Sequence, residues 1–339
     1  MARRERCEDV AVPDRPDQPR RGFVAAVRSW VDPLVVAILA VLVLGLVLPA
    51  TGSVADVLDT VRTIAIVVLF FGYGARMRTT EVWDGLRSWR LQGSMLAATF
   101  IVFPILGLLT QLLPHAVLAP ELATGVLYLS LLPSTVQSSV VFTSIARGNV
   151  AGAITGATIS NVVGVVVTPL LAALLLGGSG GASSPLGGIL VQLLVPFVAG
   201  QLLQPWIGGW VRAHASLTRA TDRATILLVA YTAVSEAQTS GAWDHVTAGA
   251  LVWLLAVCAV LLAAMLTITW TAGRSMAPPD RTALLMVGSK KSLATGLPMA
   301  AVLFTPAVAA SVALPVIVFH QIQLATCAVL ARRLAARVE

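Results

Sequence analysis

Long apolar segments separated by short polar ones run along almost the whole chain. Because a helix needs about 20 mainly apolar residues to cross a bilayer, this pattern predicts a series of membrane spans. We place ten of them, near residues 31–50, 57–75, 91–113, 121–146, 150–176, 188–208, 225–242, 247–272, 281–304 and 307–330. The predicted fold class is therefore an all-α polytopic membrane protein with ten transmembrane helices.

A loop rich in glycine and serine at 177–187 divides the chain into two halves of five spans. The charge-free stretch from Gly148 to Val211 is too long for one helix, and this loop supplies the turn-forming residues that break it. An odd number of spans per half makes the second half enter the membrane upside down, as an inverted-topology repeat. The predicted parts are a disordered cytoplasmic tail at 1–22, a first five-helix repeat at 23–176, the linker loop at 177–187 and a second five-helix repeat at 188–339.

The fourth span of each half contains a polar cluster. The first cluster consists of Pro133, Ser134, Thr135, Gln137, Ser138 and Ser139, and the second of Ser289, Lys290, Lys291 and Ser292. Pro133 has no N–H group and disfavours a helical conformation at Leu132. Lipid cannot satisfy freed backbone groups, and matched broken helices form the substrate sites of many transporters. We therefore predict discontinuous fourth and ninth helices that cross. The alternative is a simple proline kink with serine and threonine bonded back to their own helix.

Two consecutive lysines lie deep in the ninth predicted span. Lys290 follows Arg281 by nine residues, so a rise of 1.5 Å per residue places it roughly 13 Å into a hydrocarbon core about 30 Å thick. A charged lysine at that depth costs at least about 2.5 kcal/mol. Lys290 and Lys291 therefore predict a polar cavity or a counter-charge. The alternative is that both side chains snorkel from a helix end.

Further polar side chains follow the two breaks at equivalent places. Asn161 lies in the fifth span, and His320, Gln321 and Gln323 lie in the tenth. We assign Asn161 and Gln321 to the predicted substrate or ion site. Glu236 in the seventh span is a candidate, with His320, for a proton relay. Alternatively, Glu236 lies at the outer mouth of the protein.

Composition excludes other classes of protein. Hydrophobic residues make up 57% of the chain, charged residues 12%, and the mean hydropathy is +0.86, which leaves too little polar surface for a soluble globule. The net charge of +7 comes from arginines at helix ends, so we expect no nucleic-acid partner. Among the 23 basic residues, Arg62 alone falls outside the predicted cytoplasmic side and the lysine pair. The positive-inside rule then predicts cytoplasmic termini in an inner or plasma membrane.

Motifs for cofactors are absent from the sequence. Cys7, Cys258 and Cys327 have neither metal-site spacing nor a disulfide pattern. A phosphate-binding glycine loop is also missing, so the chain carries no ATP motor of its own. We expect no cofactor, and energy from an ion gradient or from the gradient of the substrate.

The motifs around both breaks resemble those of the bile acid:sodium symporter family, and most closely its divergent SBF-like bacterial branch. The similarity covers nearly all ten spans. It is carried by the runs 132–140, 146–149, 160–161, 168–169, 288–293 and 320–324. The resemblance implies a panel domain and a core domain, with spans three to five and eight to ten in the core and the broken helices crossing near the midplane. It also implies transport by alternating access.

The resemblance further implies two sodium ions behind the crossing, with a central glutamate on the ninth helix. Thr99, Thr158, Ser138 and Ser139 lie where sodium ligands are expected. Met286 or a neighbour stands in place of the glutamate, and the two lysines follow it. A fixed ammonium group repels a nearby cation. Our hypothesis is that Lys290 or Lys291 substitutes for a sodium ion, holds the crossing helices together, and cycles its proton or pairs with an anionic substrate.

Together these features predict a secondary active transporter rather than an enzyme. Its partners are the lipid bilayer and a small organic, anionic solute, and the coupling ion is sodium or a proton. The oligomeric state is left open. The alternative function is a non-transporting membrane regulator or sensor that keeps the transporter fold. An intramembrane enzyme would need Glu236 and His320 to meet near a lysine.

Overall fold

The computed structural model describes residues 33–77, 88–176, 186–241 and 247–337. Within these ranges the chain forms helices and turns and no β-strand. The predicted tail at 1–22 and most of the predicted linker at 177–187 lie outside the described residues, and a helix already begins at Leu186. The all-helical class predicted from the sequence is confirmed.

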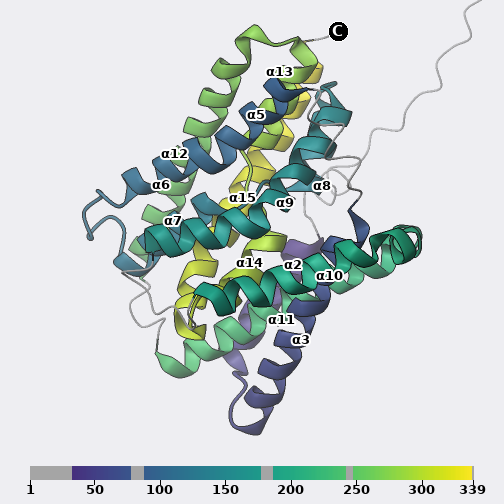
Figure 1. The fold of residues 1–339 in the computed structure, drawn as a ribbon. Coiled ribbons are helices and arrows are strands. Elements are labelled where there is room, and N and C mark those ends of the chain that lie inside the picture. The colour runs from purple at the N-terminus through teal and green to yellow at the C-terminus, as the bar shows by residue number, and fades with distance from the viewer. Residues whose placement is uncertain (1–32, 78–87, 177–185, 242–246, 338–339) are drawn as a thin grey trace, which may run out of the picture.

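Each predicted span overlaps a helix or a group of consecutive helices, most of which contain many apolar residues (Figure 1). Spans four and nine are each divided into two helices, as predicted. The elements in chain order are α2 (Pro33–Val47), α3 (Ser53–Arg76), α5 (Trp89–Ala97), the π-helix η1 (Ala98–Val102), α6 (Phe103–Thr110), α7 (Pro120–Leu131), α8 (Val136–Ile145), α9 (Val150–Leu176), α10 (Leu186–Ala213), α11 (Ala215–Ser240), α12 (Ala248–Ala272), the 3₁₀ turn η2 (Gly273–Ser275), α13 (Pro278–Gly288), α14 (Leu293–Leu303) and α15 (Pro306–Ala335).

Length and composition mark this chain as a multi-pass membrane protein. Among the described residues, four helical segments are long and apolar enough to cross a bilayer: 89–110, 150–176, 248–275 and 308–335. The pair α7 and α8 makes a fifth if it is counted as one broken span, since the two helices are bent by 65° at a short break. A simple kink in a continuous helix therefore does not describe this span.

The helices form two groups. The helices α2, α3, α10 and α11 gather in the lower part of Figure 1, and the remaining helices stand above them. In the lower group α10 packs along α3, and α11 packs along α2. The long helix α15 lies in the upper group and contacts α7, α14 and α12 as well as α11. The broken helices α7/α8 and α13/α14 thus belong to the upper group.

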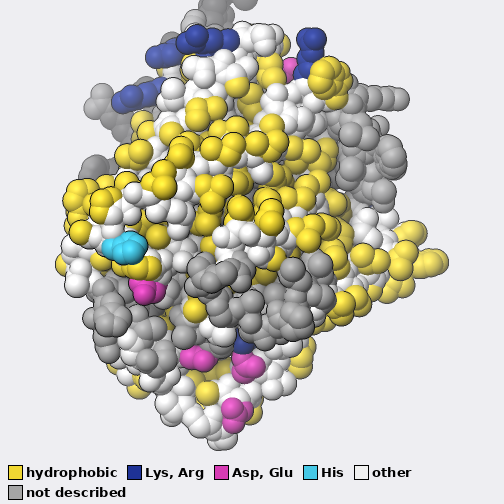
Figure 2. Space-filling view, turned by 60° about the vertical axis from the view of Figure 1, so that its left-hand side comes forward, with side chains coloured by type: hydrophobic (Ala, Val, Ile, Leu, Met, Phe, Trp, Pro, Cys, Tyr) yellow, Lys and Arg dark blue, Asp and Glu magenta, His cyan; other side chains and the backbone are white. Residues whose placement is uncertain are grey.

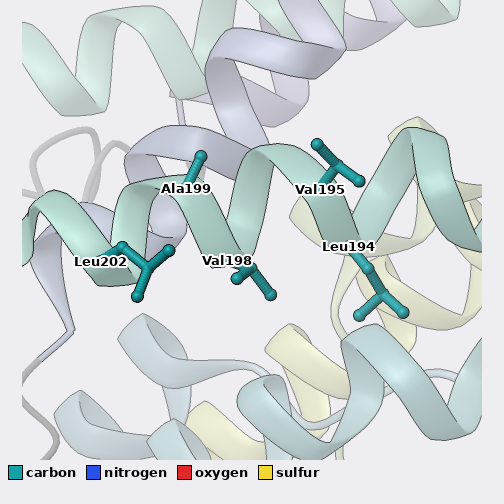
Figure 3. A pocket seen from close by; sticks show the side chains of 5 residues that line it. All are labelled: Leu194, Val195, Val198, Ala199 and Leu202. Atoms are coloured by element: carbon teal, nitrogen blue, oxygen red, sulfur yellow. The ribbon is translucent and has the colours of Figure 1, made fainter.

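The surface divides by side-chain type. Figure 2 shows a broad hydrophobic band, with most of the visible arginine side chains at the upper end and most of the visible acidic side chains near the lower end. Large apolar side chains such as Leu112 and Leu174 are about four-fifths exposed. On α10 the side chains of Leu194, Val195, Val198, Ala199 and Leu202 line a shallow apolar groove of about 310 Å³ (Figure 3). Such surface is suited to lipid chains.

Two glycines bring α3 and α10 into close contact. A Cβ atom at Gly74 would overlap the carbonyl oxygen of Phe197, and one at Gly200 would overlap that of Phe71. Gln201 Nε2 adds hydrogen bonds to Gly74 O at 2.5 Å and to Met77 O at 3.0 Å. Backbone therefore packs on backbone here, an arrangement that small residues permit in membrane helix pairs.

We expect Gly74→Ala to lower the free energy of unfolding by about 1–3 kcal/mol, because the new methyl group must push two backbones apart. Gly72→Ala is the matched control, since a Cβ atom there meets nothing within 4 Å. That control should be neutral or stabilising by up to about 1 kcal/mol, the gain in helix propensity. Melting temperatures of the detergent-purified variants test this. Equal losses for both variants would contradict the packing.

Candidate functional site

The two interrupted helices meet at their breaks. Residues 132–135 separate α7 from α8, and residues 289–292 separate α13 from α14. Across the crossing, Ser292 N donates a backbone hydrogen bond of 2.9 Å to Pro133 O. Ser289 and Lys290 have no exposed surface, and Lys291 is 1% exposed. The polar clusters therefore form a packed contact inside the protein.

Five consecutive carbonyl groups at the end of α7 and in the first break have hydrogen-bond donors from elsewhere in the protein. Helix α7 ends because Pro133 cannot donate a hydrogen bond, so the carbonyls near its end need other donors. Five consecutive carbonyls obtain donors from α9 or from the second break. These hydrogen bonds, each 2.7–2.9 Å long, run from Lys291 Nζ to Ser130 O, Thr168 Oγ1 to Leu131 O, Lys291 Nζ to Leu132 O, Ser292 N to Pro133 O and Asn161 Nδ2 to Ser134 O.

Serine side chains of the first break bind the second one. Ser134 Oγ donates to Val287 O at 2.6 Å, and Ser139 Oγ donates to Met286 O at 3.0 Å. Both acceptors lie in the last turn of α13, where carbonyls have no helical partner. The main-chain N–H of Ser134 in turn donates to Ser160 Oγ on α9 at 3.0 Å. Each break thus supplies donors for the other.

Lys291 is enclosed by main-chain oxygen atoms. Its Nζ donates to Thr99 O at 2.8 Å and to Ser130 O and Leu132 O at 2.7 Å each. It also lies 4.3 Å from the ring centroid of Phe103, at cation–π distance. An ammonium group has three N–H donors, so three carbonyls use all of them. We call this set of three carbonyls and one ring the carbonyl cage.

The third span contributes its carbonyl through a local distortion. In η1 the N–H of Phe103 bonds to Ala98 O, five residues back, instead of to Thr99 O. The next residue, Pro104, has no N–H to offer. Thr99 O is consequently left without a helical donor and accepts from Lys291. The hydroxyl of Thr99 bonds to Met95 O within its own helix at 2.8 Å.

Lys290 lies in a different environment. Its Nζ donates to Ser138 O at 3.0 Å and lies 4.1 Å from the ring centroid of Phe142, both on α8. This contact reaches the start of α8, whereas Lys291 reaches the end of α7. In this conformation each ammonium group contacts main-chain carbonyl oxygen and an aromatic ring, and neither is paired with a carboxylate among the described residues. The lysines are also far too buried to snorkel, so that alternative is wrong.

The remaining predicted residues have varied positions. Thr135 occupies the N-cap position of α8 without a side-chain capping hydrogen bond, and it is half-buried. Gln137 is exposed on α8. Thr158 is half-buried on α9. Gln321 Nε2 is buried, and within the described residues it has no hydrogen-bond partner. The structure therefore joins Ser134, Ser138, Ser139, Asn161 and the lysines directly, and places Gln137 outside this contact.

The residue of α15 that binds the second break is Gln323, not the predicted Gln321. Gln323 Oε1 accepts from Lys291 N at 2.9 Å, and its Nε2 donates to Lys291 O at 2.8 Å. The same Nε2 lies 2.8 Å from His320 Nδ1. Sequence alone does not distinguish Gln323 from Gln321, because both are polar groups in the same span.

Sequence analysis also missed Thr99 O as a ligand of a lysine and Phe103 as its ring partner. The signal was Pro104, since a proline inside a membrane span frees a carbonyl one turn earlier.

Glu236 lies in another part of the molecule. It lines a cavity of about 630 Å³ near the junction of α2 and α3, together with Asp56, Asp59, Arg62 and Ser235. Arg62 is paired with Asp59 in that cavity. The placement agrees with the alternative that Glu236 lies at a mouth of the protein. His320, by contrast, lies at the second break.

Comparison with known proteins finds relatives along nearly the whole chain. The model of the SBF-like CPA transporter family matches residues 32–336. "Uncharacterized protein PA2026" of Pseudomonas aeruginosa is 44% identical over 90% of this chain and 93% of its own length. "Putative symporter YfeH" of Escherichia coli is 42% identical over 89% of this chain and 92% of its own length. "Sodium/bile acid cotransporter 7-B" of Xenopus laevis is 27% identical over 88% and 89%.

The matched region includes every described helix. It also contains both breaks with their lysine and serine residues. The motifs at these breaks had predicted an SBF-like branch of the bile acid:sodium symporters. With a family match over nearly the full length, that prediction is confirmed. The chain belongs to the SBF-like CPA transporter family.

Proposed function

We propose that this protein is a secondary active transporter that moves a small organic anion across the cell membrane by alternating access. The observation that carries the proposal is the position of Lys291, whose ammonium group binds carbonyls of the third span and of the broken fourth span at once. A resident cation at the crossing of two broken helices is suited to holding one state of a transport cycle. Main-chain oxygens of broken helices form ion sites in other secondary transporters.

The inverted repeat that we propose is supported by the matching anatomy of the two halves. Helices α7 and α13 both begin with proline, and each is followed by a four-residue break, 132–135 and 289–292. A short second helix of 10 or 11 residues follows, and then a long helix with an internal proline. The first helix of the first half, α2, packs on the second helix of the second half, α11. In the same way α3, the second helix of the first half, packs on α10, the first helix of the second half, as a two-fold relation between the halves requires.

In this arrangement we take α2, α3, α10 and α11 as the panel domain and the other helices as the core domain. The close backbone packing between α3 and α10 suits a rigid panel. We place both termini on the cytoplasmic side, because most of the visible arginine side chains lie at one end of the hydrophobic band (Figure 2). The cell membrane is the compartment that fits a bacterial-type transporter with this charge bias.

A sodium ion does not fit the carbonyl cage beside a charged Lys291. The three carbonyls that would bind it are within 2.8 Å of Nζ. Two unit charges 4 Å apart repel by about 4 kcal/mol at an effective dielectric constant of 20. We therefore propose that Lys291 takes the structural place of a sodium ion, as the hypothesis from the sequence states.

Lys290 is the better candidate for the coupling step. Its Nζ has one carbonyl partner and one ring, and neither carries a negative charge. Two N–H donors therefore remain for a substrate carboxylate or sulfonate when the breaks open. We propose that Lys290 pairs with the anion or exchanges a proton, and that a proton gradient drives transport.

Flux measurements test the proposed function. The purified protein is first screened by thermal shift against a panel of carboxylates and sulfonates, including a bile acid, because a ligand that binds only the folded state raises its stability. Uptake of the best stabilising anion into proteoliposomes is then measured with a proton gradient. We expect accumulation above equilibrium. Binding without flux would support the non-transporting regulator instead.

Lys291→Ala should create a sodium site where the wild-type protein has none. Removing the ammonium group leaves Thr99 O, Ser130 O and Leu132 O around a space suited to a monovalent cation. We expect NaCl to raise the melting temperature of this variant relative to choline chloride of equal ionic strength. At a sodium concentration 100 times the dissociation constant, the gain is about 2.7 kcal/mol. If sodium stabilises the wild-type protein equally, the proposal that Lys291 takes the place of a sodium ion is contradicted.

The two lysines should differ in their contribution to stability. Lys291→Met leaves three buried carbonyls without a donor, and each such group costs about 1–3 kcal/mol. Lys290→Met removes one donor from Ser138 O, which lies within α8 and has a helical partner as well, so its loss should be smaller. The measurement is the melting temperature of both variants in the same detergent. Equal losses, or a larger loss for Lys290→Met, would contradict the carbonyl cage.

A further inference from the structure

Gln323 clamps the main chain of Lys291 with both ends of its amide. Oε1 accepts the Lys291 N–H at 2.9 Å, and Nε2 donates to the Lys291 carbonyl at 2.8 Å. Gln323 has no exposed surface. Because Lys291 lies between α13 and α14, this clamp supplies both hydrogen bonds that its main chain lacks in the absence of a helix. We call these two bonds the glutamine clamp.

The clamp fixes the orientation of the amide group. The Lys291 N–H must face Gln323 Oε1, and the Lys291 carbonyl must face Gln323 Nε2. A flipped amide would therefore lose both bonds to Lys291. The second hydrogen of Nε2 then points to His320 Nδ1 at 2.8 Å. Nε2 is only a donor, so Nδ1 must be an acceptor. The clamp therefore requires a His320 that carries no proton on Nδ1.

We propose that His320 is a positioning residue that controls the break in the ninth span through Gln323. When a proton binds to Nδ1, two donors face each other across 2.8 Å. The amide then flips so that its oxygen accepts from the imidazolium, and the flipped amide loses both hydrogen bonds to Lys291. The flip releases the main chain of Lys291, and with it the ammonium group that holds the carbonyl cage. Acidification thus loosens the crossing and favours its opening.

This inference deepens the proposed function, on which its meaning for transport rests, by naming a pH-sensitive device at the same site. The geometry of the clamp itself stands independently of what is transported. Histidine is the side chain that changes charge between about pH 5 and pH 8. His320 is 8% exposed, so its ring would take up a proton inside the core rather than at the surface.

Several other ionisable groups lie on α15 or on the elements packed against it. Lys290 and Lys291 face it from the second break, and the Cys327 thiol lies on α15 itself and interacts with Lys290. Helices α8 and α14, which pack on α15, contain no ionisable side chain. The other packed helices carry Glu121 and Tyr128 on α7, Arg219, Asp222, Arg223, Tyr231 and Glu236 on α11, and Cys258 on α12.

Hydrogen–deuterium exchange of the intact protein tests the clamp without any substrate. Short peptides covering the second break report the Lys291 amide, whose protection is normalised to the intrinsic exchange rate at each pH. In the wild-type protein we expect this protection to fall by about tenfold or more between pH 7.5 and pH 5.5. Peptides from the α3–α10 contact should keep their protection.

Variants separate the role of His320 from that of its neighbours. His320→Asn keeps a carbonyl acceptor near the position of Nδ1 and cannot titrate, so protection should be high at both pH values. His320→Leu has no group that titrates, and the amide keeps its two hydrogen bonds to Lys291, so protection should again be the same at both pH values. Gln323→Leu should abolish the clamp, whereas Gln321→Leu, the matched amide two residues away, should leave it unchanged.

A loss of protection at pH 5.5 that persists in His320→Asn or in His320→Leu would overturn the proposal. If His320→Leu fails to fold, the comparison of wild type with His320→Asn still decides. Failure of transport with an intact pH response would refute the proposed function and leave the clamp standing. Where an anion with measurable uptake is found, the pH dependence of uptake should likewise be lost in His320→Asn.

Discussion

The structure depends on the match between a buried ammonium group and main-chain carbonyls that have lost their helical donors. Helices can cross a bilayer only if every backbone group is satisfied within the protein. Pro133 and Pro104 remove donors from two neighbouring spans, and Lys291 replaces them with the three N–H groups of a single side chain. A charge that would otherwise be costly in the membrane and carbonyls that would otherwise be unpaired thus satisfy each other.

This exchange also explains why the two breaks lie against each other. The donors that complete the first break come from the second, as in the bond from Ser292 N to Pro133 O, and those that complete the second come partly from the first, as in Ser134 Oγ to Val287 O. Neither break could be satisfied by its own helix. Helices α9 and α15 supply the remainder through Asn161 and Gln323, so the crossing is held from two sides.

Two kinds of packing meet in this fold. Between α3 and α10, glycines bring the backbones into direct contact. If one helix slid along the other, residues with a Cβ atom would overlap the main chain of the neighbouring helix. At the crossing, side chains and freed main-chain groups form individual hydrogen bonds, which can be exchanged for others one at a time. A closely packed pair of helices beside a region with exchangeable contacts is suited to the alternating access that we propose for this protein. The apolar groove on α10 leaves that helix with a surface suited to lipid.

The sequence by itself determined the helical membrane class and the location of both breaks, because hydrophobic length and proline act locally along the chain. The resemblance to a known family added the hypothesis that a lysine takes the place of a bound cation. Only the tertiary structure decided that Lys291 rather than Lys290 fills the carbonyl cage, that Gln323 rather than Gln321 holds it, and that Thr99 contributes its carbonyl rather than its hydroxyl. These choices depend on which side of a helix meets another span, and neighbouring residues of the same type look alike until the helices are packed.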